Sequence, residues 1–172
     1  MKAWLVLLLL FFFGSLDTAK SQDDNGVIVY VFLYEDCVIS QHYTLVLKEL
    51  HAEFASEQLQ FRGVFPNSRT DDMDMLIFRS QYELPFEVVR DEDLSLTRRL
   101  GARVTPEVVV YDTRAEAVLY KGRIDDTYFR VGKKRRVTTS SELRDVLEAI
   151  SNGTPITTEN TEAIGCFIEG VR

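Results

Sequence analysis

Two cysteines are the residues of this sequence whose type and position favour covalent chemistry. Glu35 and Asp36 separate Cys37 from an apolar, β-rich run at residues 27–34, and apolar residues with helical spacing follow it at residues 39–54. A thiol at the start of a helix is stabilised as a thiolate by free backbone N–H groups and the helix dipole. The carboxylates of Glu35 and Asp36 act in the opposite direction, but solvent screens them. We therefore expect the pKa of Cys37 to lie below the free value of about 8.5.

Cys166 is the second thiol, and it lies in a segment at residues 154–172 that has neither a helical stripe nor a strand-like run. The stretch from Asn152 to Cys166 spans about 45 Å if extended, and a domain of this size is roughly 35 Å across. Cys166 can therefore reach Cys37, and we predict that the two lie close together. Two roles stay open: a static disulfide worth about 2–4 kcal/mol, or a resolving thiol for Cys37.

The elements that must position Cys37 alternate between strands and helices. We expect strands at residues 27–34, 59–65, 86–89, 108–111 and 118–122, and helices at residues 39–57, 70–81, 93–100 and 140–150. A basic, polar loop is expected at residues 124–139. This order predicts an α/β fold with a central mixed sheet flanked by helices, in which the last two strands pair antiparallel.

The beginning of the chain has the pattern of a secretory signal. Lys2 is followed by an apolar run at residues 3–13, which is too short to span a bilayer comfortably. A small-x-small site at residues 19–21 follows, so we expect a signal peptide at residues 1–21 and cleavage before Gln22. This predicts export to the periplasm or the extracellular space, where disulfides persist, and no stable membrane span after signal removal. An uncleaved N-terminal anchor is the alternative.

Composition and charge exclude several classes of protein. Apolar residues make up 45% of the chain and charged residues 27%, so a disordered or fibrous protein is excluded. The net charge of −7 argues against nucleic acid as a partner, since phosphate binding needs a basic face. The basic run at residues 133–136 is interpreted as a solvated loop. We expect one domain at residues 22–153 and an extended C-terminal tail at residues 154–172 that carries Cys166.

Four short motifs along the chain carry a resemblance. They are Asp36-Cys37-Val38-Ile39-Ser40, Val104-Thr105-Pro106-Glu107, Gly122-Arg123-Ile124-Asp125-Asp126 and Ala163-Ile164-Gly165-Cys166. With the order of elements, they resemble the thioredoxin fold and, within it, the exported redoxin and peroxiredoxin-like proteins of bacteria. The resemblance covers about residues 26–168.

The resemblance implies a thioredoxin-like fold and a thiol-based redox protein. The implied site residues are Cys37 as nucleophile, Cys166 as resolving thiol, Asp36 and Ser40 beside the helix start, and Thr105 and Pro106 in a substrate groove. The Thr105-Pro106 bond is then expected to be cis and to face Cys37. The implied partners are protein or small-molecule thiols, disulfides or peroxides, and neither a metal nor a cofactor is expected.

Two departures from the family patterns matter for mechanism. Ser40 replaces the second cysteine of a Cys-x-x-Cys pair, so a mixed disulfide on Cys37 cannot be resolved locally. Peroxiredoxins carry a Thr three residues before their reactive Cys and an Arg at the foot of a later strand. Tyr34 and Pro106 hold those positions here, so the peroxide-activating set is incomplete unless Arg103 or Arg123 substitutes in space.

Two functions of different class are therefore carried forward. The first is an exported thiol-disulfide oxidoreductase or peroxiredoxin-like antioxidant. The second is a non-enzymatic binding module on the same fold, with a structural Cys37–Cys166 disulfide. A variant of the second is a copper-chaperone-like site, in which His42 joins the two thiols as a soft-metal ligand. The alternative interpretation of His42 and His51 is that both are surface or partly buried residues of the first helix without a role in metal binding.

Overall fold

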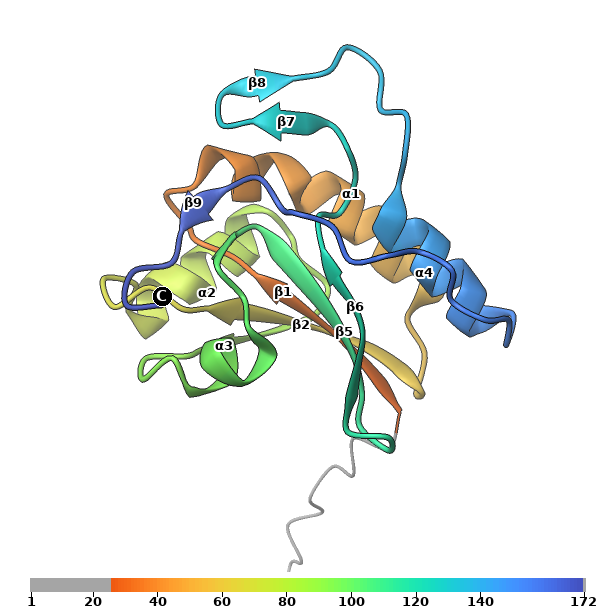
Figure 1. Cartoon of the computed structure of the whole chain (residues 1–172). Coiled ribbons are helices and arrows are strands. Elements are labelled where there is room, and N and C mark those ends of the chain that lie inside the picture. Colours follow the sequence, from red (N-terminus) through yellow and green to blue (C-terminus); the bar gives the residue numbers. More distant parts are fainter. Residues whose placement is uncertain (1–25, 172) are drawn as a thin grey trace, which may run out of the picture.

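The computed structural model describes residues 26–171, which form a five-stranded mixed sheet covered by helices (Figure 1). The strands of this sheet are β1 (Val27–Phe32), β2 (Leu59–Phe65), β3 (Glu87–Arg90), β5 (Glu107–Asp112) and β6 (Ala117–Gly122). Their order is β3-β2-β1-β5-β6. β1, β2 and β3 are parallel, whereas β5 runs antiparallel to β1 and β6 antiparallel to β5. The predicted mixed sheet with an antiparallel final pair is confirmed, and the expected signal peptide lies outside the described residues.

Four helices pack on this sheet: α1 (Val38–Phe54), α2 (Asp72–Gln81), α3 (Ser95–Leu100) and α4 (Glu142–Ser151). Successive side chains of a strand point to opposite faces, and β1 is buried on both. One face holds Val29 and Val31 with apolar residues of α1, α2 and α4. The other holds Ile28 and Tyr30 with Leu100 at the end of α3. β1 is thus the centre of the core, and its carboxyl end fixes where Cys37 must lie.

Two segments have more structure than we expected. The basic loop contains a small hairpin of β7 (Tyr128–Arg130) and β8 (Lys133–Lys134). The tail contains β9 (Cys166–Phe167), which pairs antiparallel with β4 (Val104–Thr105). Figure 1 shows the tail running from the end of α4 back across the molecule to this pair. Each of these strands is two or three residues long, too short to leave a periodic pattern in the sequence.

The tail is bound along its length rather than loosely attached. The N–H of Thr161 donates to the Lys121 carbonyl, and the Asn160 side chain accepts the Lys121 N–H. Nearer the end, the N–H of Ile168 donates to the carbonyl of Arg103. These bonds hold the tail beside the edge strand β6 and the turn before β5. No helix within residues 26–171 is long and apolar enough to cross a membrane.

The buried bond between Tyr43 and Asp125 gives a stability prediction. The Tyr43 hydroxyl donates to Asp125 Oδ1 at 2.6 Å, joining α1 to the segment that leads into β7. Tyr43→Phe leaves a buried carboxylate short of one donor, so we expect a loss of about 1–3 kcal/mol in the free energy of unfolding. Urea denaturation measures this, with Tyr34→Phe as the matched control, because the Tyr34 hydroxyl bonds Asp36 in an exposed position. Equal losses in the two variants would contradict the assignment.

Candidate active site

Cys37 is the N-cap of α1, in line with the predicted position at the start of a helix, and it is fully buried. Five residues of irregular chain separate the end of β1 from α1, and the N–H of Cys37 donates to the carbonyl of Tyr34. The cap has extended backbone, which leaves the first N–H groups of the helix free of intrahelical partners. The Cys37 side chain therefore lies against a helix start from which backbone donors point toward its sulfur.

Cys166 is brought to Cys37 by the β4–β9 pair, in which Cys166 lies opposite Thr105. The Cys166 thiol donates to Cys37 Sγ, with the two sulfur atoms 2.8 Å apart. Both cysteines are free thiols in this structure. The prediction that the two cysteines lie close together is confirmed.

The approach of the tail to β4 depends on Gly165. A Cβ placed on this residue would lie 2.1 Å from the Thr105 carbonyl oxygen, far inside contact distance. Only a residue without a side chain lets β9 lie this close to the turn that contains Pro106. Gly165 stood in one of the motifs that carry the resemblance, but a packing role for it could not be read from the sequence alone.

The Thr105-Pro106 bond is cis and faces Cys37, as expected. The carbonyl oxygen of Thr105 accepts the Cys37 thiol at 3.1 Å. Both Thr105 and Pro106 are buried, and Thr105 Oγ1 donates to the Cys166 carbonyl at 3.4 Å. The face of β4 that was expected to line a substrate groove is thus occupied by the chain's own tail.

The two thiols differ in acidity. Burial acts to raise the pKa of Cys37, but hydrogen bonds from Cys166 and from the backbone of Ser40 and Ile39 outweigh it, so this pKa is lowered. Burial and the hydrogen bond and charge of Cys37 together raise the pKa of Cys166 to about 12. Cys37 is therefore the more acidic thiol of the pair, and Cys166 is the donor in the hydrogen bond between them.

The acidic neighbours of Cys37 accept hydrogen bonds from hydroxyl groups. Glu35 accepts the hydroxyl of Thr70, and Asp36 accepts the hydroxyl of Tyr34 in an exposed position. Ser40, which replaces the second cysteine of the thioredoxin pattern, is buried, and its Oγ accepts the N–H of Tyr34. Ser40 thus ties the loop before Cys37 to the first turn of α1.

Tyr128 is a neighbour of the thiol site that the sequence analysis did not place there, and it packs beside His42, which was considered only as a metal ligand. Burial and the nearby charge of Cys37 raise the pKa of Tyr128. The Tyr128 ring meets the rings of His42 and Tyr43 edge-on or tilted, with centroids 5.3 and 5.8 Å away. No sequence signal marked Tyr128, because it belongs to a segment that was expected to be a solvated loop.

Two other roles considered from the sequence were a peroxide-activating arginine and a metal site. Arg123, which was considered as a replacement for the missing peroxide-activating arginine, donates to Glu142 and Ser140 instead. His51 packs against Phe61 and Phe86, remote from the thiols. Within residues 26–171, no group of three or more His, Cys, Asp and Glu side chains is arranged to hold a metal ion.

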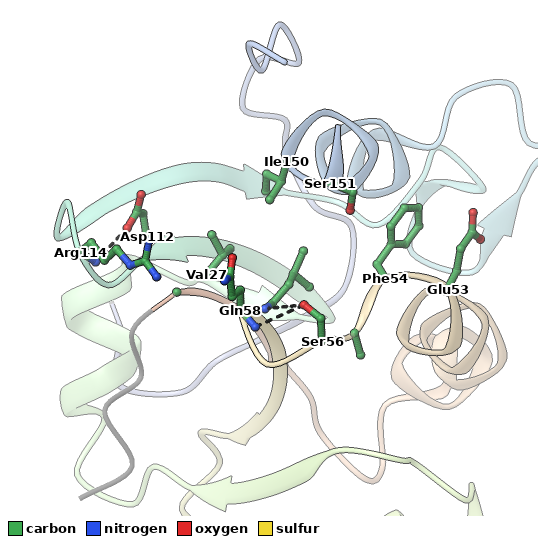
Figure 2. A pocket seen from close by; sticks show the side chains of 12 residues that line it. Val27, Glu53, Phe54, Ser56, Gln58, Asp112, Arg114, Ile150 and Ser151 are labelled. Atoms are coloured by element: carbon green, nitrogen blue, oxygen red, sulfur yellow. Dashed lines mark hydrogen bonds between the residues drawn. The ribbon is translucent and has the colours of Figure 1, made fainter. Parts of the chain in front are cut away.

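A cavity of about 430 Å³ lies away from the thiols (Figure 2). It is formed where β1 and β2 begin and where α1 and α4 end. Val27, Phe54, Ser56, Asp112 and Ile150 are among its lining residues. Its lining contains no cysteine or histidine, and the carboxyl ends of the parallel strands, where ligands bind in open α/β sheets, are at the other edge. This cavity is therefore not part of the thiol site.

The sheet, its helices and the cis proline beside Cys37 define a thioredoxin-like α/β fold. A protein-family model described as the AhpC/TSA family matches residues 14–137, and the chain belongs to this family. The matched segment contains Cys37 and Pro106 but ends before Cys166. A search of curated protein sequences gives no match.

Solved structures share this fold at low sequence identity. An uncharacterised conserved protein from Geobacillus kaustophilus is 21% identical with a TM-score of 0.73, covering 84% of this chain and 77% of that one. A hypothetical protein from Sinorhizobium meliloti 1021 is 22% identical with a TM-score of 0.73, covering 86% and 81%. A secreted disulfide oxidoreductase of Mycobacterium tuberculosis, homologous to E. coli DsbE, is 19% identical with a TM-score of 0.51, covering 73% and 82%.

Gly165→Ala tests whether the tail shields Cys37. The added Cβ collides with the Thr105 carbonyl and destabilises the β4–β9 pair by about 1–3 kcal/mol. We expect alkylation of Cys37 by iodoacetamide to accelerate about tenfold or more, because the shielded thiol becomes exposed more often. Peptide mapping by mass spectrometry measures the rate at each cysteine. Gly153→Ala is the control for a general loss of stability, since its φ of +64° strains an alanine there although the added Cβ meets no atom within 4 Å. An unchanged rate in Gly165→Ala would mean that β9 does not limit access.

Substitutions of Cys166 can remove or keep the hydrogen bond that it donates to Cys37. Cys166→Ala deletes the S–H donor, whereas Cys166→Ser keeps a hydroxyl at the same place. We expect the pKa of Cys37 to rise by about one unit in the alanine variant relative to the serine variant, because a hydrogen bond to the thiolate lowers a thiol's pKa. The pH dependence of Cys37 alkylation reports it. The serine variant should titrate below about 8.5, and equal midpoints would show that Cys166 does not stabilise the thiolate.

Proposed function

We propose that this protein is a thiol-disulfide oxidoreductase in which Cys37 is the nucleophile and Cys166 the resolving thiol. The observation that carries the proposal is the contact of the two sulfur atoms, 2.8 Å apart, with the pKa of Cys37 lowered and that of Cys166 raised. Unequal acidity assigns the first attack to Cys37, because the thiolate is the reactive form. The family match and the thioredoxin-like fold support the same chemistry.

The reaction proceeds by two thiol-disulfide exchanges. The Cys37 thiolate attacks a substrate disulfide, forms a mixed disulfide and releases the first substrate thiolate. Cys166 then loses its proton and attacks the Cys37 sulfur, which releases the second substrate thiolate and leaves a Cys37–Cys166 disulfide. Two external thiols reduce this disulfide through a mixed disulfide, leave joined as a disulfide of their own, and close the cycle. The chain therefore gives up two electrons, one pair, to each substrate disulfide.

The raised pKa of Cys166 orders the two steps. Burial is the largest cause of the raised pKa, followed by the hydrogen bond to Cys37 and the charge of Cys37, and the last two are lost when Cys37 enters the mixed disulfide. Cys166 thus holds its proton before the first attack and becomes more acidic after it. Because Cys37 is fully buried, β9 must separate from β4 before a large substrate reaches the thiolate.

Disulfides are better substrates for this site than peroxides. The residue three before Cys37 is Tyr34, and the guanidinium of Arg123 is bound to Glu142. Of the groups that activate a peroxide in peroxiredoxins, the Thr is therefore missing and Arg123 is engaged elsewhere. We propose export as well, because residues 1–21 have the pattern of a secretory signal and the proposed cycle suits an oxidising compartment.

Single cysteine variants test the assignment. Cys37→Ser should abolish reduction of a model disulfide, because it removes the attacking thiolate. Cys166→Ser should leave the first attack intact and accumulate a mixed disulfide on Cys37, which mass spectrometry detects as a substrate adduct. Parallel assays with hydrogen peroxide and tert-butyl hydroperoxide measure peroxide turnover. If both variants keep wild-type activity, or if the adduct forms on Cys166 in Cys37→Ser, the proposal is wrong.

A further inference from the structure

The segment at residues 128–136, here called the basic hairpin, has an unusual charge for this protein. It carries five Lys and Arg side chains and no acidic residue, although the whole chain has a net charge of −7. All residues from Phe129 to Arg136 are exposed. Arg135 binds Asp126 at the base of the hairpin. The other four cations, Arg130, Lys133, Lys134 and Arg136, make no side-chain hydrogen bond or ion pair with any residue between 26 and 171.

The hairpin is a built element rather than a loose loop. At its base, Asp126 accepts the N–H groups of Thr139 and Ser140 and pairs with Arg135. Thr127 and Thr138 share a hydrogen bond between their hydroxyls. The Asp126 carboxylate is thus fully engaged at the base of the hairpin, and the positive charges at its tip face solvent.

The hairpin also lies beside the thiol site. Tyr128, its first residue, packs on His42 of α1 and is close enough to Cys37 for the charge of that thiolate to act on it. Burial and the charge of Lys134 lower the pKa of His42. Figure 1 shows β7 and β8 projecting from the body of the molecule above α1. A partner whose thiol reaches Cys166 therefore comes within reach of the hairpin.

Exposed apolar side chains lie among and around these cations. Phe129, Val131 and Val137 are 53%, 61% and 71% exposed. Beside the thiols, Phe167 of β9 is 86% exposed and Val38 of α1 is 67% exposed. Mixed cationic and apolar surfaces suit polypeptides, which present both carboxylates and apolar side chains.

The opposite side of the site is acidic. Glu35, Asp36 and Asp74 line a hollow of about 220 Å³ between α1 and α2, and Asp71 and Asp72 begin α2 next to it. A flat anionic membrane or a nucleic acid is uniformly negative, so it would meet this side as well as the hairpin. A polypeptide can place acidic residues on one side of its cysteine only, and it thereby avoids the repulsion.

We propose that the basic hairpin is the docking surface for the polypeptide that exchanges disulfides with this protein, and that this partner carries acidic residues on one side of its reactive cysteine. The inference rests on the proposed thiol-disulfide function. Charge complementarity of this kind mainly accelerates encounter, by about 10- to 1,000-fold at low salt. It would confer partner preference on a site whose thiols are otherwise reached only after β9 opens.

Reduction of the oxidised protein by synthetic peptides tests the docking surface. Each peptide carries one cysteine, with three Glu before it or after it, and each has a Lys counterpart. One peptide thiolate attacks the Cys37–Cys166 disulfide and forms a mixed disulfide, and a second displaces the protein thiolate and forms a peptide disulfide. We expect at least one acidic peptide to react about tenfold faster than its Lys counterpart at 20 mM salt, and the preference to vanish at 500 mM salt.

Two charge-reversal variants locate the effect. K133E/R136E should abolish or invert the ratio of acidic to basic rate constants, and this ratio cancels any general change in thiol reactivity. R98E/R99E makes the same change in net charge on α3, whose two arginines are exposed, and should keep the wild-type preference. Uncharged dithiothreitol tests the proposed thiol-disulfide function separately from the docking surface, because it has no charge for the hairpin to attract. If dithiothreitol cannot reduce a Cys37–Cys166 disulfide, the proposed function fails.

The docking proposal fails alone in any of three outcomes. In the first, dithiothreitol and all peptides react, but the rate constants of the acidic and basic peptides are equal. In the second, R98E/R99E loses the preference for acidic peptides as K133E/R136E does. In the third, the preference of the wild-type protein survives at 500 mM salt. Binding of the protein to phosphatidylglycerol vesicles or to single-stranded DNA, with loss of binding in K133E/R136E only, would likewise overturn it in favour of another anionic partner.

Discussion

The two-residue pairing of β9 with β4 is the constraint on which the thiol site depends. It sets Cys166 opposite Thr105, places the two sulfur atoms in contact and closes the end of the sheet over Cys37. Two residue pairs contribute little free energy alone, so the pairing relies on Gly165 for close approach and on hydrogen bonds that bind the tail along β6. A local contact of this size can be opened, which a redox cycle needs and a permanent staple does not.

Unequal environments make two chemically identical thiols take different roles. Cys37 receives donors from the start of α1 and from Cys166, so its charged form is stabilised despite burial. Cys166 has no comparable set of donors, and the charge of its neighbour acts against its ionisation. The same physics explains how one cysteine outside the usual Cys-x-x-Cys spacing can serve as the second thiol: what matters is its distance in space.

Residue patterns with a local cause were predictable, and contacts with a non-local cause were not. The helical stripe after Cys37 and the continuous apolar run of β1 placed the nucleophile at a helix start, because burial and periodicity are local properties. Proximity of Cys166 followed from chain length. The β4–β9 register and the Tyr128 contact could not be predicted, since each joins segments distant in the sequence through very short strands. The sequence also suggested a groove at Pro106 but not that the tail fills it.

The central claim is that Cys37 and Cys166 form a reversible redox pair. The most direct measurement is the equilibrium between dithiol and disulfide in dithiothreitol or glutathione buffers, quenched by acid and quantified by mass spectrometry. Stabilisation of the Cys37 thiolate favours the reduced form, so we expect one two-electron transition within the range of exchange-active proteins, about −270 to −120 mV. A reduction potential below about −300 mV would identify the disulfide as a static structural bond and contradict the redox role. The absence of any Cys37–Cys166 disulfide in oxidising buffers would contradict the account altogether.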